Sequence, residues 1–152
     1  GPGGVYGEKI GLNSSYGGDH GIRMAEAYLN RAEALARRFQ AKGDGNDRVQ
    51  ALDDLNTLRE TRFATDTYVE EEVTDAQDLL DFCLNERRLE LCCEEGFRWF
   101  DIKRLGLSVT HKYIDSEGVE REYVLESNSP LYALPIPYDA IERNYKLKQN
   151  PR

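Results

Sequence analysis

The sequence is poor in the residue types that build redox, metal and membrane sites. It has three cysteines, two histidines, one tryptophan and one methionine among 152 residues. No Cys-x-x-Cys or Cys/His zinc spacing occurs, and no apolar run approaches the length of a membrane-spanning helix. Acidic residues outnumber basic ones by 28 to 20, which gives a net charge of −8 at pH 7. Because these motifs are missing, we expect no metal and no cofactor. We also expect no nucleic-acid partner, because an acidic chain repels phosphate backbones.

The three cysteines, Cys83, Cys92 and Cys93, all fall within one helical pattern. Cys83 and Cys92 would lie about 13 Å apart along that helix at ~1.5 Å per residue, which exceeds the reach of a disulfide. Adjacent Cys92 and Cys93 would point in different directions. A catalytic cysteine would need a basic partner, and His20 and His111 are remote in sequence. We therefore expect three reduced thiols, mostly buried.

What the sequence has in plenty is helical apolar periodicity, and it is densest in Leu79–Glu95. The apolar side chains of this stretch spread over more than half of a helical wheel, so we expect protein on most sides of the helix. Thr74 or Asp75 is the expected cap at its start. Gly96 is expected to end it in the left-handed conformation.

Four charged residues project within that apolar arc: Glu86, Arg87, Glu90 and Glu94. Buried charges are unfavourable unless they are paired and hydrogen-bonded, so a facing helix should carry their partners. The amphipathic helix expected over Ile22–Phe39 has Glu26 and Glu33 at the edge of its apolar face, and Glu33 and Arg37 form an i,i+4 pair. We expect Arg87 to pair with Glu33 or Glu26 through its guanidinium fork. The predicted structural ion network comprises Glu26, Glu33, Glu86, Arg87 and Glu90.

The first half of the chain predicts a helical hairpin. Its parts are Ile22–Phe39, the Gly/Asp-rich turn Ala41–Asp47 with Asn46 or Asp47 as the next cap, and Arg48–Phe63. The length and the Ala/Tyr/Leu spacing are typical of one tetratricopeptide-like pair. Such a pair must stack on a neighbour to bury its apolar face. A polar, acidic link, Ala64–Val73, should follow it.

The periodicity changes in the C-terminal third. Lys112–Ile114 and Val119–Leu125 flank a turn sequence and predict a β-hairpin. Leu131–Pro137 should be extended because its prolines disfavour a helix, and Asp139–Arg143 should form one helical turn. The predicted fold is mainly α, with tetratricopeptide-like antiparallel helix pairs, a small β-hairpin and an irregular C-terminal extension.

Two further segments complete the predicted organisation. Gly1–Gly21 is rich in Gly, Ser, Asn and Tyr, and we expect an irregular segment that ends a missing upstream region, followed by a helical domain over residues 22–152. The stretch Phe97–Arg104 mixes aromatic and basic residues, which is compatible with a nucleic-acid patch. The acidic net charge favours the alternative, in which Trp99 and its aromatic neighbours close a core.

Four motifs in this order resemble the C-terminal part of the SusD/RagB family of Bacteroidetes. They are IRMAEAYLNRAEALAR, ALDDLNTLRETR, LLDFCLNERRLELCCEEGFRWFDIKRLG and YALPIPYDAIERNYKLKQNP. The resemblance implies a helical, tetratricopeptide-like fold in a cell-surface lipoprotein of the outer membrane. It also implies a non-catalytic role, in which the protein binds oligosaccharide or polysaccharide and passes it to a SusC-like TonB-dependent transporter. The sequence departs from the family pattern at Cys92-Cys93-Glu94, where an aliphatic–aromatic stretch is usual.

Sugar binding needs aromatic faces, so the exposed-looking tyrosines are the candidate glycan contacts: Tyr6, Tyr16, Tyr68 and Tyr113. The resemblance places most family sugar contacts upstream of this stretch, so we expect weak or absent glycan binding by the chain alone.

Two other functions are compatible with parts of the sequence. A glycoside hydrolase would need paired acids, but Glu86, Glu90 and Glu94 occur beside Arg87, as in a structural network. A tetratricopeptide-like adaptor for protein partners would explain the helices, but not the hairpin or the segment LYALPIP.

Overall fold

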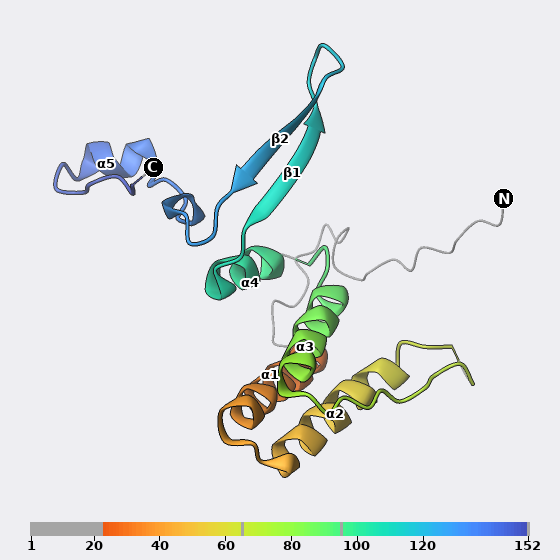
Figure 1. Ribbon diagram of the computed structural model, residues 1–152. Helices are drawn as coiled ribbons and strands as arrows, with labels where there is room; N and C mark the ends of the chain where they lie inside the picture. The colour runs from red at the N-terminus through yellow and green to blue at the C-terminus, as the bar shows by residue number, and fades with distance from the viewer. Residues whose placement is uncertain (1–22, 65, 95, 152) are drawn as a thin grey trace. The chain divides into compact units, whose positions relative to one another are not determined.

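The computed structural model describes residues 23–64, 66–94 and 96–151 (Figure 1). The chain divides into two compact units, which we treat separately: a helical unit that ends at Glu95 and a C-terminal unit that begins at Gly96. The order of elements confirms the predicted class, which is mainly α with one small β-hairpin.

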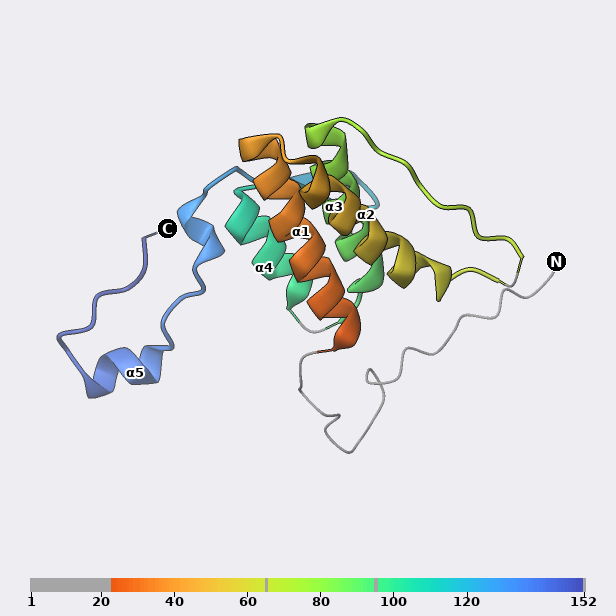
Figure 2. The same cartoon turned by 90° about the horizontal axis from the view of Figure 1, so that it is seen from below.

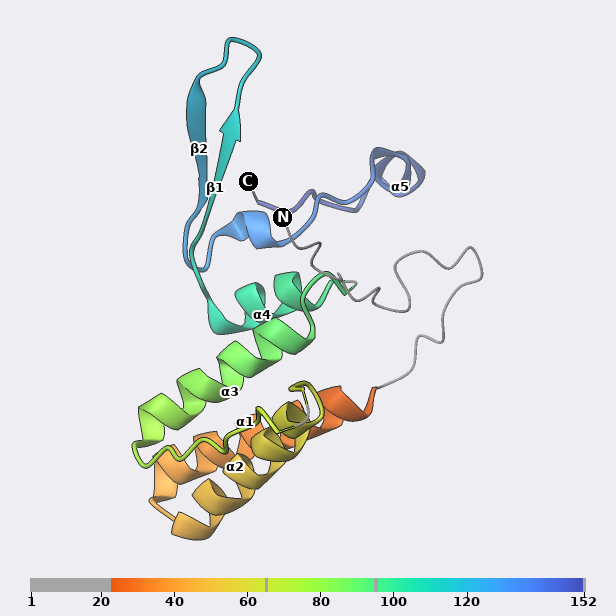
Figure 3. The ribbon, with the colours of Figure 1, turned by 90° about the vertical axis from the view of Figure 1, so that its right-hand side faces the viewer.

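Three helices make up the described part of the helical unit: α1 (Met24–Lys42), α2 (Gly45–Glu60) and α3 (Ala76–Glu90). α1 and α2 run antiparallel as a hairpin, and α3 packs chiefly against α1 (Figures 2 and 3). The predicted helical hairpin is therefore confirmed, with ends shifted by a few residues.

The core of the helical unit consists mainly of alanine and leucine side chains, most of them on the facing stripes of the three helices. Alanines on α1 allow the neighbouring helices to approach it closely, and leucines fill the space between the helices. The buried apolar residues are Ala25, Leu29, Ala32, Leu35, Ala36, Ala51, Leu52, Leu55, Leu58, Leu79, Leu80, Cys83 and Leu91.

The turn between α1 and α2 depends on two adjacent residues. Gly43 adopts the left-handed conformation (φ 71°) directly after α1. Asp44 then caps α2, because its carboxylate accepts a hydrogen bond from the backbone N–H of Asn46 at 2.9 Å. The prediction of Asn46 or Asp47 as the cap was wrong, since the Asp47 carboxylate turns towards α1.

Two pairs of charged residues join α1 to α2, and we call them the fork pairs. Arg38 Nε donates to Asp47 Oδ2 at 2.6 Å, and Arg31 Nε donates to Asp54 Oδ2 at 2.7 Å. In each pair, Nη2 reaches the other carboxylate oxygen. Both carboxylates are buried, and the Arg38 guanidinium lowers the pKa of Asp47. The pairs are seven residues apart on each helix, which places them on one side of the hairpin.

The predicted polar link, Ala64–Val73, is attached to α2. The Asn56 side chain accepts from the N–H of Glu71 and donates to its carbonyl, at 3.1 Å each. Arg48 Nη1 donates to the carbonyl of Val73 at 3.2 Å. The link thus satisfies part of its backbone hydrogen bonding with side chains of α2.

α3 begins as predicted and ends earlier. Asp75 caps it by accepting hydrogen bonds from the N–H groups of Gln77 and Asp78 at 2.8 and 3.0 Å. The helix ends at Glu90, so the prediction that it continues to the end of the apolar pattern was wrong. The reason is that Leu91 leaves helical geometry and is buried in the core.

The left-handed residue after α3 is Cys93 (φ 60°), whereas Gly96 has φ −103°. The prediction for Gly96 was therefore wrong. All three cysteines are in the thiol form, as predicted, but Cys92 and Cys93 lie after the helix and are exposed. Only Cys83 is buried, because the chain turns at Leu91 before the other two could face the core.

The C-terminal unit contains short elements: α4 (Phe97–Leu105), β1 (Val109–Ile114), β2 (Glu120–Leu125), a 3₁₀ turn (Pro130–Tyr132) and α5 (Tyr138–Arg143). The β-hairpin and the helical turn of α5 confirm the predictions for those segments. The segment predicted to be extended from Leu131 instead begins within the 3₁₀ turn, where Ser129 accepts from the N–H of Leu131.

Few side chains are buried in the C-terminal unit. Ile102 of α4 and Tyr132 are the buried apolar residues among its described positions. Trp99 packs on Tyr132 with ring centroids 5.7 Å apart, and the Tyr132 hydroxyl donates to the carbonyl of Leu107. Trp99 is half-buried in this contact, which agrees with the core alternative for the aromatic stretch of α4.

Candidate functional site

The four candidate tyrosines differ in how far the structure describes them. Tyr6 and Tyr16 lie outside the described residues. Tyr68 was expected to be exposed, but it is half-buried, with its ring 5.6 Å from the ring of Phe63. Burial of its hydroxyl raises the pKa of Tyr68. Only Tyr113 is described with an exposed ring, on strand β1 of the hairpin.

Tyr113 forms a stacked pair with Tyr123 of β2. The ring centroids are 4.9 Å apart, the planes differ by 8°, and the two hydroxyls are within 3.3 Å. The strand register pairs Tyr113 with Arg121 and His111 with Tyr123, so the tyrosines are diagonal neighbours on one face. Their side chains are 37% and 67% exposed, which leaves ring surface available to a ligand.

Arg121 beside this stack is held by the turn of the hairpin. Its Nε donates to Asp115 Oδ2 at 2.6 Å. Asp115 also accepts from the N–H groups of Glu117 and Val119, and the hydrogen bond from Arg121 is the main cause of its lowered pKa. Among the described residues, the Nη groups of Arg121 make no hydrogen bond. A fixed guanidinium thus keeps donors available next to two aromatic rings.

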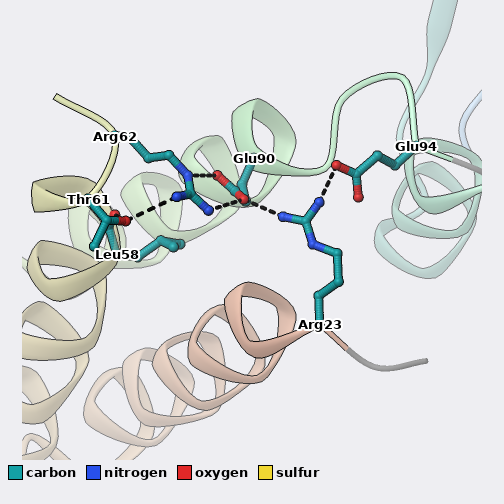
Figure 4. A network of polar contacts seen from close by, with 6 residues as sticks. All are labelled: Arg23, Leu58, Thr61, Arg62, Glu90 and Glu94. Atoms are coloured by element: carbon teal, nitrogen blue, oxygen red, sulfur yellow. Dashed lines mark hydrogen bonds and ion pairs between the residues drawn. The ribbon is translucent and has the colours of Figure 1, made fainter. Parts of the chain in front are cut away.

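The second cluster is the ion network at the ends of the three helices (Figure 4). Arg62, directly after α2, donates to both oxygens of Glu90 at 2.7 and 2.8 Å. Arg23, at the start of α1, reaches both Glu90 and Glu94. These contacts, with the hydrogen bond from Arg62 as the largest cause, lower the pKa of Glu90. The last residue of α3 is thereby tied to one end of each other helix.

Glu86 lies one turn before Glu90 and pairs with Arg59 of α2 at 3.7 Å. Burial raises the pKa of Glu86, and Arg59 partly opposes this effect. The Arg59 guanidinium is surrounded by the rings of Phe63, Tyr68 and Phe82, at 5.3, 5.8 and 5.3 Å from their centroids. This packing is the reason that Tyr68 is not exposed.

Arg87 is buried, as predicted, with 7% exposure. Its Nη1 donates to Asn30 Oδ1 of α1 at 2.8 Å. Glu33 forms the predicted i,i+4 pair with Arg37 at 2.8 Å. Glu26 makes no ion pair with another described residue, so the structure does not bring it into the network. Pairing of Arg87 with Glu33 stays a prediction.

The acidic residues of this network were predicted from the sequence, but their partners Arg23, Arg59 and Arg62 were not. Glu86, Glu90 and Glu94 recur at four-residue spacing, and Arg59 and Arg62 lie three apart at the end of the preceding helix. That match of spacings was a usable signal, because residues three or four apart share one helix face. These carboxylates are held by arginines, which suits a structural role better than proton transfer.

The described residues contain neither a metal-binding cluster nor a membrane-spanning helix. No group of three or more His, Cys, Asp or Glu side chains is arranged to hold a metal ion within residues 23–64, 66–94 and 96–151. In the same part of the chain, no helix has the length and apolar character needed to cross a membrane.

Known proteins with similar sequences are found for nearly the whole chain. A family model described as the SusD family matches residues 7–152. The "Starch-binding protein SusD" of Bacteroides thetaiotaomicron is 36% identical over 130 residues, which cover 85% of this chain and 20% of that protein. In Formosa agariphila, "SusD-like protein P38" is 32% identical over 90 residues, 58% of this chain and 17% of that protein. "SusD-like protein P2" of the same organism is 29% identical over 133 residues, 85% of this chain and 24% of that protein.

The chain thus spans only about a fifth of the length of the curated relatives it matches, from 17% to 24%. No solved structure matches it.

Proposed function

We propose a function from one premise: the chain belongs to the SusD family, whose model matches residues 7–152. The chain is part of a cell-surface protein of the outer membrane that binds an oligosaccharide or polysaccharide. That protein delivers the glycan to a SusC-like TonB-dependent transporter and is held at the membrane by a lipid anchor elsewhere in the protein. The observation that carries this proposal is the family match, together with a relative named for starch binding.

Within that protein, residues 22–152 serve as a helical C-terminal domain. Its α1–α2 hairpin is closed by paired charges and a leucine core, as a scaffold requires. Of the four tyrosine candidates, Tyr113 is the one whose described position supports a contact with glycan, because its ring lies exposed on the hairpin. Tyr6, Tyr16 and Tyr68 are the other candidates for glycan contacts.

The protein is a binding protein without catalytic activity. Glycoside hydrolysis needs two carboxyl groups that can exchange protons with the substrate. The acids that sequence reasoning considered for this role, Glu86, Glu90 and Glu94, are hydrogen-bonded or ion-paired to arginines at helix ends. This arrangement supports a structural function for them.

A tetratricopeptide-like module for protein partners is the second candidate function. The antiparallel α1–α2 hairpin with its small-residue contacts favours it. The two functions differ in their ligands, so binding experiments separate them.

The test uses the intact protein that contains this chain. We expect a glycan array to retain it on at least one oligosaccharide, and co-purification to recover a TonB-dependent transporter. Incubation with the retained polysaccharide should release no new reducing ends above background. Failure to bind any glycan, combined with capture of a protein partner, would favour the second function. Turnover of the polysaccharide would contradict the assignment as a binding protein.

A further inference from the structure

We propose that one face of the β1–β2 hairpin is a stacking surface for a neutral pyranose oligosaccharide; this inference rests on the proposed glycan-binding function. The face consists of the side chains that alternate to one side of the strands: Val109, His111, Tyr113, Arg121, Tyr123 and Leu125. We call it the tyrosine face.

The stacked tyrosines supply the apolar part of the surface. Because the rings of Tyr113 and Tyr123 are 4.9 Å apart and nearly parallel, each covers one face of the other and leaves its second face directed away. Tyr123 is 67% exposed. A pyranose ring presents a flat patch of C–H groups of similar size, so it can pack on such an aromatic face as another ring would.

Polar groups border the rings where the hydroxyls of a sugar would lie. Arg121 is directly across from Tyr113, and Asp115 holds it through Nε at 2.6 Å. Its Nη donors make no hydrogen bond among the described residues and are positioned in advance. The Tyr113 hydroxyl donates to the Tyr123 hydroxyl, which leaves an acceptor on Tyr113 and a donor on Tyr123. A small number of oriented polar groups beside apolar rings is the usual composition of a site for a small ligand.

The opposite face of the hairpin provides the internal contrast. It carries Lys112, which donates to Glu120 at 2.9 Å and lies 3.3 Å from Glu122. Its charges are thus paired with each other, and its exposed apolar residues, Ile114 and Val124, are aliphatic. Only the tyrosine face combines aromatic rings with an unused donor.

Charge selects the class of sugar. The stretch 109–125 contains two basic and four acidic residues, and the chain as a whole has a net charge of −8. This balance disfavours the approach of a uronate or sulfated polysaccharide, although Arg121 lies on the tyrosine face, whereas a neutral chain is not repelled. The ligand class is therefore a neutral oligosaccharide, such as a gluco-, manno- or xylo-oligosaccharide.

The experiment is a titration of the ¹⁵N-labelled chain, followed by its backbone amide spectrum, which detects weak binding. The probes are maltoheptaose, mannohexaose and xylohexaose, with hexagalacturonate as the anionic comparison. We expect at least one neutral probe to shift the amides of the tyrosine face, and hexagalacturonate to bind no better. Tyr123→Ala should weaken binding about tenfold, and Tyr123→Phe, which keeps the ring, should change it less than about threefold.

Val124→Ala is the matched control, because the neighbouring side chain is 50% exposed on the opposite face. It should leave affinity unchanged, and the spectra of all variants report whether the hairpin stays folded. Shifts confined to other elements, equal losses in Tyr123→Ala and Val124→Ala, or no response to any probe would overturn the tyrosine face. If the intact protein still binds glycan in those cases, the proposed function stands and the inference alone fails.

Discussion

The helical unit and the C-terminal unit use their apolar residues in opposite ways. All but two of the buried apolar residues described lie in the helical unit. Most of the exposed large hydrophobic side chains lie in the C-terminal unit, including Tyr123, Leu134, Tyr138 and Tyr145. The helical unit therefore buries its apolar side chains in its own core, which stabilises it. The C-terminal unit leaves its apolar side chains exposed and available for contacts. Substitutions in each unit should reflect this difference.

The largest effect should come from a buried charge in the helical unit. Arg87→Met removes a buried guanidinium that donates to Asn30, and on the predicted pairing it also takes this partner away from the buried carboxylate of Glu33. We expect the free energy of unfolding to fall by about 3–5 kcal/mol in denaturant titrations. Arg88→Met is the matched control, since Arg88 is exposed and should cost less than about 1 kcal/mol. Similar small losses in both variants would contradict the account of α3.

The contrast in apolar residues can be tested with one leucine from each unit. Leu79 is 0% exposed in the helical unit, and Leu134 is 73% exposed in the C-terminal unit. Leu79→Ala should lower the free energy of unfolding by about 2–5 kcal/mol through the cavity it leaves. Leu134→Ala should change it by less than about 0.5 kcal/mol. A comparable loss in Leu134→Ala would show that the C-terminal unit buries this side chain in solution.

A smaller effect concerns pH, and two glutamates of α3 should act with opposite signs. The folded-state pKa of Glu90 is lowered, mainly by Arg62, so its contribution to stability is present above the unfolded pKa of about 4.3 and is lost as pH falls further. Burial raises the folded-state pKa of Glu86. As pH falls, Glu86 therefore takes up its proton at a higher pH in the folded state than in the unfolded state, and this uptake stabilises the folded state.

Unfolding of Glu90→Gln and Glu86→Gln between pH 7 and pH 3 measures this difference. Glu90→Gln should flatten the acid loss of stability, whereas Glu86→Gln should steepen it. Parallel curves for the two variants would contradict the opposite pKa directions.

The smallest expected effect concerns the reactivity of the three cysteines, one inside the helical unit and two at its edge. Cys83 is buried and its pKa is raised to about 12, whereas Cys92 and Cys93 are exposed. At pH 8, a thiol reagent should modify two thiols quickly in the native protein and the third only on unfolding. Cys83→Ser should remove the slow phase. A total of one thiol in unfolded, unreduced protein would indicate a disulfide.

The sequence predicted those features that depend on local pattern. The helices of the hairpin, the Asp75 cap and the turn between β1 and β2 each follow from periodicity or from side chains a few residues apart. The Glu33–Arg37 pair belongs to the same class, because both residues lie on one helix.

Features that depend on how elements meet were missed. The stack of Tyr113 on Tyr123 requires the strand register, which brings two residues ten apart onto one face. The partial burial of Tyr68 could not be predicted from its polar neighbours in sequence, because it depends on Arg59 of α2. The partners of Glu90 were missed for the same reason, because they lie at the ends of two other helices.

The fork pairs also fix how far α2 can slide along α1. Their alanine and leucine neighbours would tolerate a displacement by one helical turn, about 5.4 Å, since it would set similar side chains opposite one another. That displacement would separate Arg31 from Asp54 and Arg38 from Asp47 at the same time, and would leave two carboxylates buried without their guanidinium groups. The two pairs thus select one alignment of α2 along α1, because both are formed only in that alignment. Exchanging arginine and aspartate within one pair only would set like charges side by side if α2 slipped by seven residues, which is the spacing of the two pairs, and would make the native alignment still more selective.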